Sequence, residues 1–425
     1  MLISFLNLPL PDIEQFFMRI AILAPSDKSF IKDFLPTEDF EKLPLGYSGA
    51  PFIGTIIKEL LKLNHTVTAI TTSKVVENDY HVKKFQYKNF TWVVVPSRPH
   101  AIKMNGNKLG RILDFFEFEQ KYILSSLIES SPDIVHAHWS YEFAGAAIKS
   151  GLPSLVTIHD NPFIIFRYFK NIYRLGRLLM AVNILRKVIH ASTVSPYMLK
   201  YARKRCKEVK IIPNPVEPRF SNEQIKKLVD IKINALNAPK IIMINNGWDK
   251  RKNGKSALLA FKILQQQHPK ATLHLFGGGS ELDGLANKEA NLLGLKNVFF
   301  YGTVSHDKII NELEDAHLFL HTALEESFGV VLIEAMSFGV PVVGGEDSGA
   351  VPWVINQKEL LVDVTNPKVI AQKIFELIND SSLYKKLSLM CFQNVLSRFS
   401  SSFVTKEYLS YYQYILSASI QKDVN

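Results

Sequence analysis

Two glutamates flank a glycine turn late in the chain, with seven residues between them. Glu326 stands in a predicted loop, and Gly329 stands where a helix is expected to begin. The start of such a helix offers free backbone N–H groups and the positive end of its dipole, which suits a phosphate. Glu334 falls about one turn further in, where its carboxylate can accept hydrogen bonds from ribose hydroxyls. The spacing therefore favours a site for a nucleotide-diphosphate sugar, although two glutamates at this spacing also occur by chance.

The segment that surrounds this pair is more specific than the pair itself. Residues 321–355 combine the Glu-Ser-Phe-Gly run at 326–329, the apolar run at 332–336 and a buried strand expected at 340–344. This segment resembles the donor-site signature of retaining glycosyltransferases of the family 4 type, which have the two-domain GT-B fold. The resemblance implies donor contacts at Phe328, Gly329, Val330 and Glu334.

A run of cations follows the first strand expected in the second half of the chain. Within residues 247–254, Lys250, Arg251 and Lys252 are adjacent and are well placed to neutralise a diphosphate. A charge run is also common in a solvated turn. In the resembled family an arginine and a lysine of this loop hold the leaving diphosphate, and the arginine usually follows the glycine directly. Trp248 stands at that position here, so the resemblance makes Arg251 and Lys252 the candidates.

Two glycine turns are further candidates for donor contacts. Gly277 opens a glycine-rich turn after a predicted strand, where the resembled family has its own such turn in the donor domain. Gly49 precedes a predicted helix in the first half, and its lack of a Cβ lets the backbone approach a phosphate or a sugar. The family usually has two adjacent glycines there, and Ser48 replaces one of them. Ordinary turns have the same composition, so both assignments depend on the resemblance.

Three histidines end two neighbouring strands expected in the first half. His159 ends one strand, and His136 and His138 end the strand before it. Strand ends in such folds face the cleft, although a lone histidine is more often structural. In the resembled family a histidine at the position of His159 touches the transferred sugar near its reacting carbon. There is no Asp-x-Asp motif and no third ligand at a telling spacing, so we expect neither a metal nor another cofactor.

Short β-branched runs alternate with helical stretches along the chain. Strands are expected at 20–24, 66–71, 91–95, 134–138, 154–159, 241–244, 272–276, 298–301, 318–321 and 340–344. Helices are expected at 53–63, 111–129, 255–267, near 294, after 329 and at 408–420. This alternation predicts an α/β protein with two Rossmann-like, doubly wound domains that face each other across a cleft.

The length of 425 residues fits two domains better than one. Three prolines in residues 211–218 forbid a continuous helix, so we place the linker there. The expected domains are an acceptor-binding domain over 18–220 and a donor-binding domain over 221–390. Residues 391–425 form a helical segment that, in the resembled family, packs back on the first domain. Residues 1–17 are an extension or follow from an upstream start.

Cysteine content and charge set limits on location and partners. Two cysteines fit a reducing cytosol, and no uncharged stretch reaches the roughly 18 residues that span a bilayer. The net charge of +10 resides in residues 1–220, and the span 167–210 has 12 basic residues against one acidic residue. Such a span fits peripheral contact of a cytoplasmic protein with an anionic membrane, and equally a solvated face over a core helix. No motif of a nucleic-acid-binding protein is present.

The resemblance implies transfer of a sugar from a UDP-type or GDP-type donor to a hydroxyl of a glycan or lipid-linked acceptor, with retention at the anomeric carbon. Arg251 and Lys252 would stabilise the leaving diphosphate, Glu326 would orient sugar hydroxyls, and Glu334 would hold the ribose. We expect the setting to be assembly of bacterial surface polysaccharide or lipopolysaccharide.

Three alternatives stay open at this point. The first is a GT-B relative with different chemistry, such as a nucleotide-sugar epimerase or a glycogen-synthase-like polymerase. The second is a non-catalytic protein that binds a sugar or a membrane surface. The third, a nicotinamide-dependent oxidoreductase, is disfavoured because residues 277–279 lack the Gly-x-Gly-x-x-Gly spacing.

Overall fold

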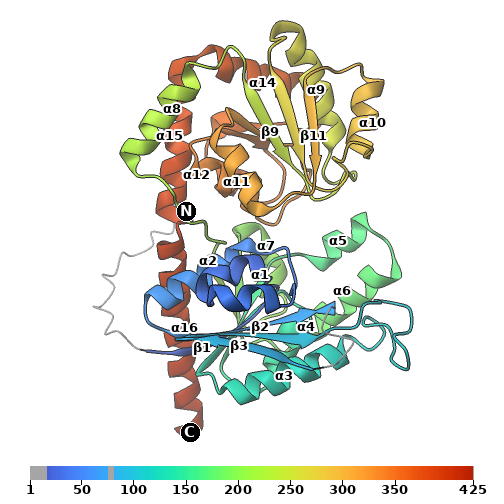
Figure 1. The fold of residues 1–425 in the computed structure, drawn as a ribbon, viewed down its shortest axis with the longest axis vertical. Helices are drawn as coiled ribbons and strands as arrows, with labels where there is room; N and C mark the ends of the chain where they lie inside the picture. The colour runs from blue at the N-terminus through green and yellow to red at the C-terminus, as the bar shows by residue number, and fades with distance from the viewer. Residues whose placement is uncertain (1–16, 75–80, 425) are drawn as a thin grey trace.

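The computed structural model describes residues 17–74 and 81–424. The chain forms two α/β halves, each built on one sheet with helices on its faces (Figure 1). This arrangement confirms the predicted fold class of two Rossmann-like domains. The predicted extension at 1–17 lies outside the described residues, apart from Phe17.

The first half is built on an eight-stranded sheet. Its strands are β1 (Arg19–Leu23), β2 (Thr66–Ser73), β3 (Lys83–Tyr87), β4 (Phe90–Pro96), β5 (Ile134–His138), β6 (Ser154–Ile158), β7 (His190–Thr193) and β8 (Glu208–Ile211). Its helices are α1 (Lys28–Ile31), α2 (Pro51–Lys62), α3 (Glu117–Ser130), α4 (Glu142–Lys149), α5 (Pro162–Tyr168), α6 (Ile172–Leu185) and α7 (Pro196–Arg203). The strand order is β3-β4-β2-β1-β5-β6-β7-β8, and only the β3–β4 pair is antiparallel within this sheet as described.

The second half is built on a six-stranded sheet whose described strand pairs are all parallel. Its strands are β9 (Lys240–Ile244), β10 (Thr272–Phe276), β11 (Val298–Gly302), β12 (Leu318–His321), β13 (Val342–Gly345) and β14 (Leu361–Val362), in the order β11-β10-β9-β12-β13-β14. The helices that follow are α8 (Asn222–Ile233), α9 (Gly254–Gln267), α10 (Leu285–Leu292), α11 (His306–Glu314), α12 (Val330–Ser337), α13 (Val351–Ile355), α14 (Pro367–Asn379), α15 (Ser381–Arg398) and α16 (Ser401–Val424).

Local sequence explains where several of these elements begin. Pro51, Pro162 and Pro196 occupy the first turn of α2, α5 and α7, where a missing N–H costs nothing. Ser221 and Gln224 form a reciprocal capping box at the start of α8. The strands that helices cover on both faces are runs of β-branched and aromatic residues, and β4 is buried along its whole length.

The predicted strands are all present, but four further strands were not predicted, and the final helix, expected from residue 408, begins at Ser401. The strands β3, β7, β8 and β14 were not predicted, because β3 is a lysine-rich edge strand and the other three have only two to four residues. The helix predicted from residue 111 begins at Glu117 instead. Phe115 and Phe116 have positive φ angles of 53° and 61°, which a helix does not accept.

The chain crosses between the halves twice, and the two crossings lie side by side. The backbone N–H of Val216 donates to Phe399, and the N–H of Ser401 donates back to Val216. Helix α16 then packs on the first half, where Tyr408 and Tyr412 join the core cluster of α2 (Figure 1). The final segment we expected from residue 391 thus starts inside α15, which packs with the core of the second half.

Candidate active site

The candidate residues of the second half lie at the carboxyl ends of three neighbouring strands. Asn245 follows β9, Gly277 follows β10 and His321 ends β12, and these strands pair in the order β10-β9-β12. Carboxyl ends of parallel strands meet at one edge of a sheet, which is where ligands bind in open α/β folds. The cation loop at 247–254 and the loop that carries Glu326 both leave from this edge.

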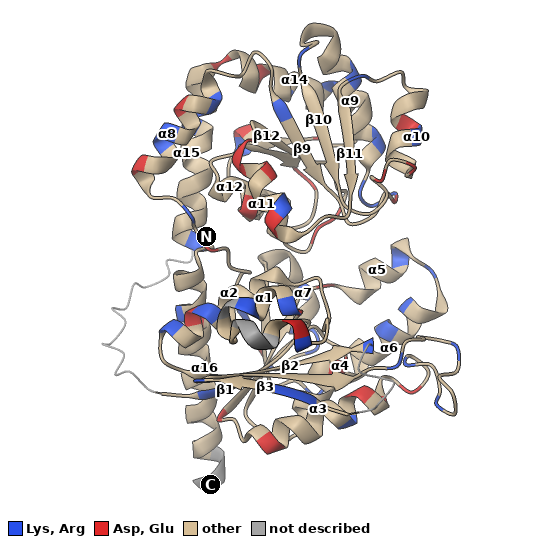
Figure 2. Ribbon diagram, viewed as in Figure 1, with Lys and Arg blue, Asp and Glu red and all other residues tan. Residues whose placement is uncertain are grey.

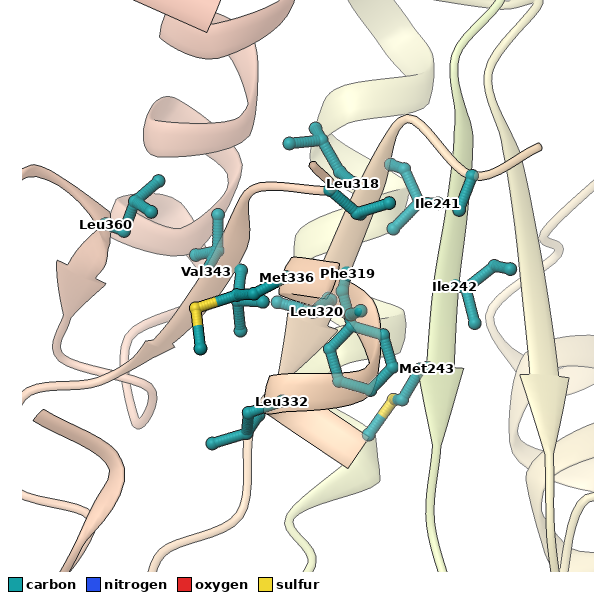
Figure 3. Packing of buried hydrophobic residues seen from close by; sticks show 14 of the residues in the cluster. Ile241, Ile242, Met243, Leu318, Phe319, Leu320, Leu332, Met336, Val343 and Leu360 are labelled. Atoms are coloured by element: carbon teal, nitrogen blue, oxygen red, sulfur yellow. The ribbon is translucent and has the colours of Figure 1, made fainter. Parts of the chain in front are cut away.

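Helix α12 is anchored by its apolar residues. Leu332 and Met336 of α12 belong to the same buried cluster as Met243 of β9 and Phe319 of β12 (Figure 3). Gly329 caps the helix with a φ of 86°, and a Cβ at this residue would lie 2.8 Å from the Leu332 side chain. Glycine is therefore required by both the backbone angle and the space. The buried contacts of Leu332 and Met336 therefore fix the position of the N–H groups in the first turn of α12.

Glu326 and Lys252 form an ion pair at this edge. The Nζ of Lys252 donates to Oε2 of Glu326 at 2.9 Å, and Nε2 of His321 lies 3.7 Å from the same oxygen. Burial alone would raise the pKa of Glu326, but the charge of Lys252 lowers it well below the usual range. Burial also lowers the pKa of His321. The pair therefore consists of a carboxylate and an ammonium at neutral pH, beside a neutral imidazole.

Arg251 lies next to this pair but contacts another carboxylate. Its Nη1 lies 3.5 Å from Oε2 of Glu325, and its Nε is buried without a hydrogen-bond partner. Burial and the charge of Glu326 raise the pKa of Glu325. The two cations predicted to hold a diphosphate thus meet one glutamate each, and Arg251 retains an unused donor.

Trp248 occupies the position where the resembled family usually has arginine. Atoms of its side chain lie within 2.6 Å of where a Cβ would stand on Gly254 and on Gly279, so both glycines make room for the tryptophan. Its Nε1 donates to Oε2 of Glu289 at 3.1 Å. Trp248 is therefore a packing residue of the loop, and the positive charge comes from Arg251 and Lys252.

Glu334 is buried on α12 and contacts a histidine of the preceding helix, α11. Nε2 of His306, at the start of α11, lies 2.7 Å from Oε1 of Glu334. Burial lowers the pKa of His306, but the hydrogen bond to Glu334 outweighs it, so the pKa is raised. A ribose at the position we predicted would therefore share Glu334 with His306.

Gly277 brings two loops together. Its φ is 95°, and a Cβ would stand 1.9 Å from the backbone oxygen of Asn245. Any larger residue would push the loop after β10 away from the loop after β9. Asn245 itself is buried, and neither its amide nitrogen nor its amide oxygen has a hydrogen-bond partner. Asn245 is therefore a candidate for a polar ligand contact at this edge of the sheet.

The three histidines of the first half form a buried row. Nδ1 of His138 lies 2.9 Å from Nε2 of His159, and the rings of His136 and His138 are 4.0 Å apart. Burial lowers the pKa of His136 and of His159 to about 3, and that of His138 falls well below its usual range. All three are neutral at pH 7. The hydroxyl of Tyr412 lies 2.6 Å from Nδ1 of His136 and ties the row to α16.

Residues of the two halves meet beside Glu326. The hydroxyl of Ser195, just before α7, donates to the backbone oxygen of Ser327 at 2.6 Å. Val330 packs against the core clusters of both halves. Phe328 is buried against Phe399, with ring centroids 5.6 Å apart, so only its main chain is free to meet a donor.

Gly49 lies in the loop before α2. Its φ is 118°, and a Cβ there would meet no atom within 4 Å. The backbone angle alone therefore explains the glycine. The role of Gly49 in donor binding stays a prediction.

Sequence models of two related families match consecutive parts of the chain. The one described as Glycosyl transferases group 1 matches residues 227–389, and the one described as Glycosyltransferase Family 4 matches residues 50–220. The solved structures with the same fold are glycosyltransferases. The chain belongs to the family 4 type of GT-B glycosyltransferases.

Individual relatives and structures are distant. This glycosyltransferase is 25% identical over 300 residues to N-acetyl-alpha-D-glucosaminyl L-malate synthase of Bacillus anthracis, which is 67% of the chain and 75% of the relative. Among solved structures, sucrose-phosphate synthase from Thermosynechococcus elongatus has a TM-score of 0.70 at 16% identity, with 94% of this chain and 99% of that one covered. HepE of Anabaena, solved in complex with UDP and glucose, has a TM-score of 0.62 at 18% identity, with 92% and 98% covered. These likenesses show the fold.

The sequence reasoning missed four polar residues of this glycosyltransferase as functional candidates. All four lie among the candidate residues of the second half. They are Asn245, His306, His321 and Glu325. Asn245 and His321 stand at the carboxyl ends of strands we had predicted, so the strand-end rule applied to His159 would have found both. His306 and Glu325 had no such signal, because their contacts with Glu334 and Arg251 cross between separate segments.

The described residues also bear on metals and membranes. Within residues 17–74 and 81–424 no group of three or more His, Cys, Asp or Glu side chains is placed to hold a metal ion. Over the same ranges no helix has the length and apolarity needed to cross a bilayer.

Proposed function

We propose that the protein transfers a sugar from a nucleotide-diphosphate donor to a hydroxyl of an acceptor, with retention at the anomeric carbon. The ion pair of Lys252 with Glu326, at the N-terminal end of α12, carries this proposal. A diphosphate beside that helix would take over the ammonium of Lys252 and release Glu326 for the sugar hydroxyls. Lys252 and the start of α12 then stabilise the negative charge that develops on the leaving diphosphate. This charge is the largest electrostatic demand of the reaction.

We propose that the reaction needs no metal ion. Arg251 and Lys252 supply two positive charges, and the backbone N–H groups at the start of α12 supply a partial one. The guanidinium of Arg251, whose Nε has no hydrogen-bond partner, would reorient to donate to a phosphate oxygen. These groups stabilise the leaving diphosphate without a Lewis acid.

The proposed step proceeds on one face of the sugar. The bond from the anomeric carbon to the phosphate oxygen breaks as the acceptor oxygen bonds to the same face, and the acceptor proton passes to the leaving phosphate. Once released from Lys252, Glu326 is directed to the sugar hydroxyls, and Nε2 of His159 is engaged by Nδ1 of His138, so neither is assigned as a nucleophile at the anomeric carbon. His159 instead offers a hydrogen bond to the sugar near its reacting carbon.

The proposed donor is of the UDP or GDP type. HepE of Anabaena was solved with UDP and glucose, and trehalose-6-phosphate synthase of E. coli was solved with UDP-2-fluoro glucose. A relative from Corynebacterium glutamicum is named for GDP-mannose. Glu334 and His306 provide an acceptor and a donor of hydrogen bonds for the ribose of either nucleotide.

The proposed acceptor is a glycan or lipid-linked hydroxyl in bacterial surface polysaccharide or lipopolysaccharide assembly. Relatives include a poly(glycerol-phosphate) alpha-glucosyltransferase of Bacillus subtilis and a capsular polysaccharide glycosyltransferase of Staphylococcus aureus. Contact with an anionic membrane is part of this proposal. Basic residues gather on α5 and α6 (Figure 2), and Phe163, Ile172 and Leu179 are exposed among them.

Product analysis with defined donors tests this function. The protein is incubated separately with UDP-glucose, UDP-N-acetylglucosamine and GDP-mannose, with and without EDTA, and nucleotide release and product are followed. We expect one donor to react, an α-linked product from an α-linked donor by proton NMR, and no loss with EDTA. A β-linked product would contradict retention, and EDTA inhibition reversed by Mg²⁺ would contradict metal independence. No nucleotide release from any of the three donors would count against transfer from these nucleotide sugars.

A further inference from the structure

A pocket of about 390 Å³ lies at the carboxyl edge of the first sheet. Its wall includes Lys74 and Ser97, which directly follow the neighbouring strands β2 and β4, and Tyr47 from the loop before α2. Arg111 and Arg177 complete it from the segment before α3 and from α6. The volume is that of a small-molecule site, and the edge is where ligands bind in this type of fold.

Arg111 has no carboxylate partner among the described residues. Its Nη1 donates to the backbone oxygen of Arg98 and lies 3.4 Å from the hydroxyl of Ser97. Its Nε is buried and makes no hydrogen bond. A buried, charged donor without a partner is costly, unless a ligand provides the acceptor.

Arg177 offers a second unused donor in the same pocket. Its Nε is also buried without a partner, and its Nη1 lies 3.5 Å from Oε2 of Glu142. The guanidinium carbon stands 3.3 Å from the ring centroid of Tyr141, so stacking fixes the plane of the group. Two guanidinium groups therefore border one small cavity, and each has a buried Nε without a hydrogen-bond partner.

The carboxylates of the wall do not cancel these charges. Both oxygens of Glu119 accept from Arg98, at 2.7 Å and 3.1 Å, and both side chains of that pair are 1% exposed. Glu142 is shared with Arg177 at the longer distance of 3.5 Å. Positive charge from Arg111, with Lys74 at the rim, is left for a ligand.

The pocket is connected to the row of histidines. The hydroxyl of Tyr141, beneath Arg177, lies 3.1 Å from Oδ1 of Asp160, which directly follows His159. An anionic group bound by Arg177 is thus separated from His159 by Tyr141 and Asp160. His159 is the histidine expected near the reacting carbon. That separation suits an acceptor whose charged end is bound while its hydroxyl reaches the sugar.

We propose that this pocket binds a phosphate or carboxylate group of the acceptor, with Arg111 and Arg177 as its ligands. The inference rests on the proposed transfer reaction and names the class of its acceptor. The shared chemistry is an anionic oxygen group, which a soluble sugar phosphate or the phosphate of a lipid-linked acceptor can supply.

Calorimetric titration of the UDP-bound protein tests the assignment. The probes are glucose 6-phosphate, L-malate and glucose, together with vesicles of phosphatidylglycerol or phosphatidylcholine. We expect an anionic probe to bind, glucose to bind at least tenfold more weakly, and Arg111→Gln to weaken the anion by about 10- to 100-fold. The Lys121→Gln variant, which removes an exposed charge from α3, is expected to match the wild type. UDP affinity and the melting temperature of Arg111→Gln serve as folding controls.

The outcomes distinguish a soluble acceptor from a lipid-linked one, and they distinguish failure of the pocket assignment from failure of the proposed function. Arg111-dependent binding of glucose 6-phosphate or malate supports a soluble acceptor, and Arg111-dependent binding of phosphatidylglycerol vesicles alone supports a lipid-linked one. If neither soluble anions nor anionic vesicles depend on Arg111 in a folded variant that still binds UDP, the pocket assignment is overturned. If the wild type binds neither UDP nor GDP, the proposed function fails first, and this inference fails with it.

Discussion

The two halves share one type of fold but place their chemistry differently. The donor half concentrates its candidates in two loops and one helix, where Lys252 meets Glu326 and Arg251 meets Glu325. The acceptor half disperses its polar groups over six separate segments, and its three histidines are neutral. Under the proposed function the difference follows from the ligands, because a nucleotide diphosphate presents the same charges whichever acceptor is used, whereas acceptors differ.

The largest expected effect distinguishes Lys252 from Lys250, two lysines of the cation loop at 247–254. Lys252→Ala should lower kcat by about 10²- to 10³-fold, because the leaving diphosphate loses a preorganised cation. Lys250 is exposed and serves as the matched control. Steady-state rates of nucleotide release for Lys250→Ala should stay within about threefold of the wild type. Equal losses in the two variants would mean that the loop acts only through its overall charge.

A smaller effect is expected at His159 in the first half. Replacing it with phenylalanine removes one hydrogen bond to the sugar and should lower kcat/KM by about tenfold. Because the pKa of His159 is about 3, the imidazole is neutral from pH 5 to 9 and its titration adds no inflection there. Comparison of pH profiles for the wild type and the variant checks this. An inflection near pH 6.5 that the variant lacks would show that the buried row protonates.

The next effect concerns stability of the acceptor half alone. Tyr412→Phe removes the hydroxyl that contacts Nδ1 of His136, which should cost about 1 kcal/mol and lower the melting temperature by about 2–4 °C. Tyr87→Phe, at an exposed site on β3, is the control. UDP affinity should be unchanged in both variants. Weaker UDP binding by Tyr412→Phe would mean that the halves are coupled through α16.

The smallest effect is a pH dependence in the donor half. The pKa of His306 is raised in the folded protein, so its pair with Glu334 contributes stability below the unfolded pKa of about 6.5 and loses it as pH rises through the folded pKa. The His306 side chain is 36% exposed, so solvent screening limits the effect to about 0.5 kcal/mol or 1 °C. His306→Gln should melt below the wild type at pH 5.5 and level with it at pH 9. The opposite order would contradict the sign of the shift.

The fold could be predicted from the sequence because its strands are buried runs with clear ends. The limits of β5, β10 and β12 match the prediction residue for residue. The edge strand β3 was not predicted because its lysines face solvent. The start of α3 was misplaced because Phe115 and Phe116 adopt positive φ angles that composition does not indicate. Tertiary contacts decide such positions.

The site could be predicted only where it is contiguous. Glu326, Gly329 and Glu334 lie within nine residues, so one motif revealed them together. Arg111 and Arg177 are 66 positions apart and lie on elements that the sheet order brings together, so no local pattern connects them. The role of Trp248 also depended on packing. Its side chain fits against Gly254 and Gly279, and the neighbouring Arg251 and Lys252 supply the positive charge of the loop.

The most direct test of the central claim is thermal unfolding of the pure protein with UDP, GDP, ADP and NAD, beside the Glu334→Ala variant. A nucleotide at about 100 times its Kd should stabilise the protein by roughly 2.7 kcal/mol, a shift of several degrees. We predict this shift with UDP or GDP, and its loss in Glu334→Ala, with each variant compared to its own ligand-free melting temperature. A shift with NAD alone, or no shift with any nucleotide, would contradict a donor site built on α12.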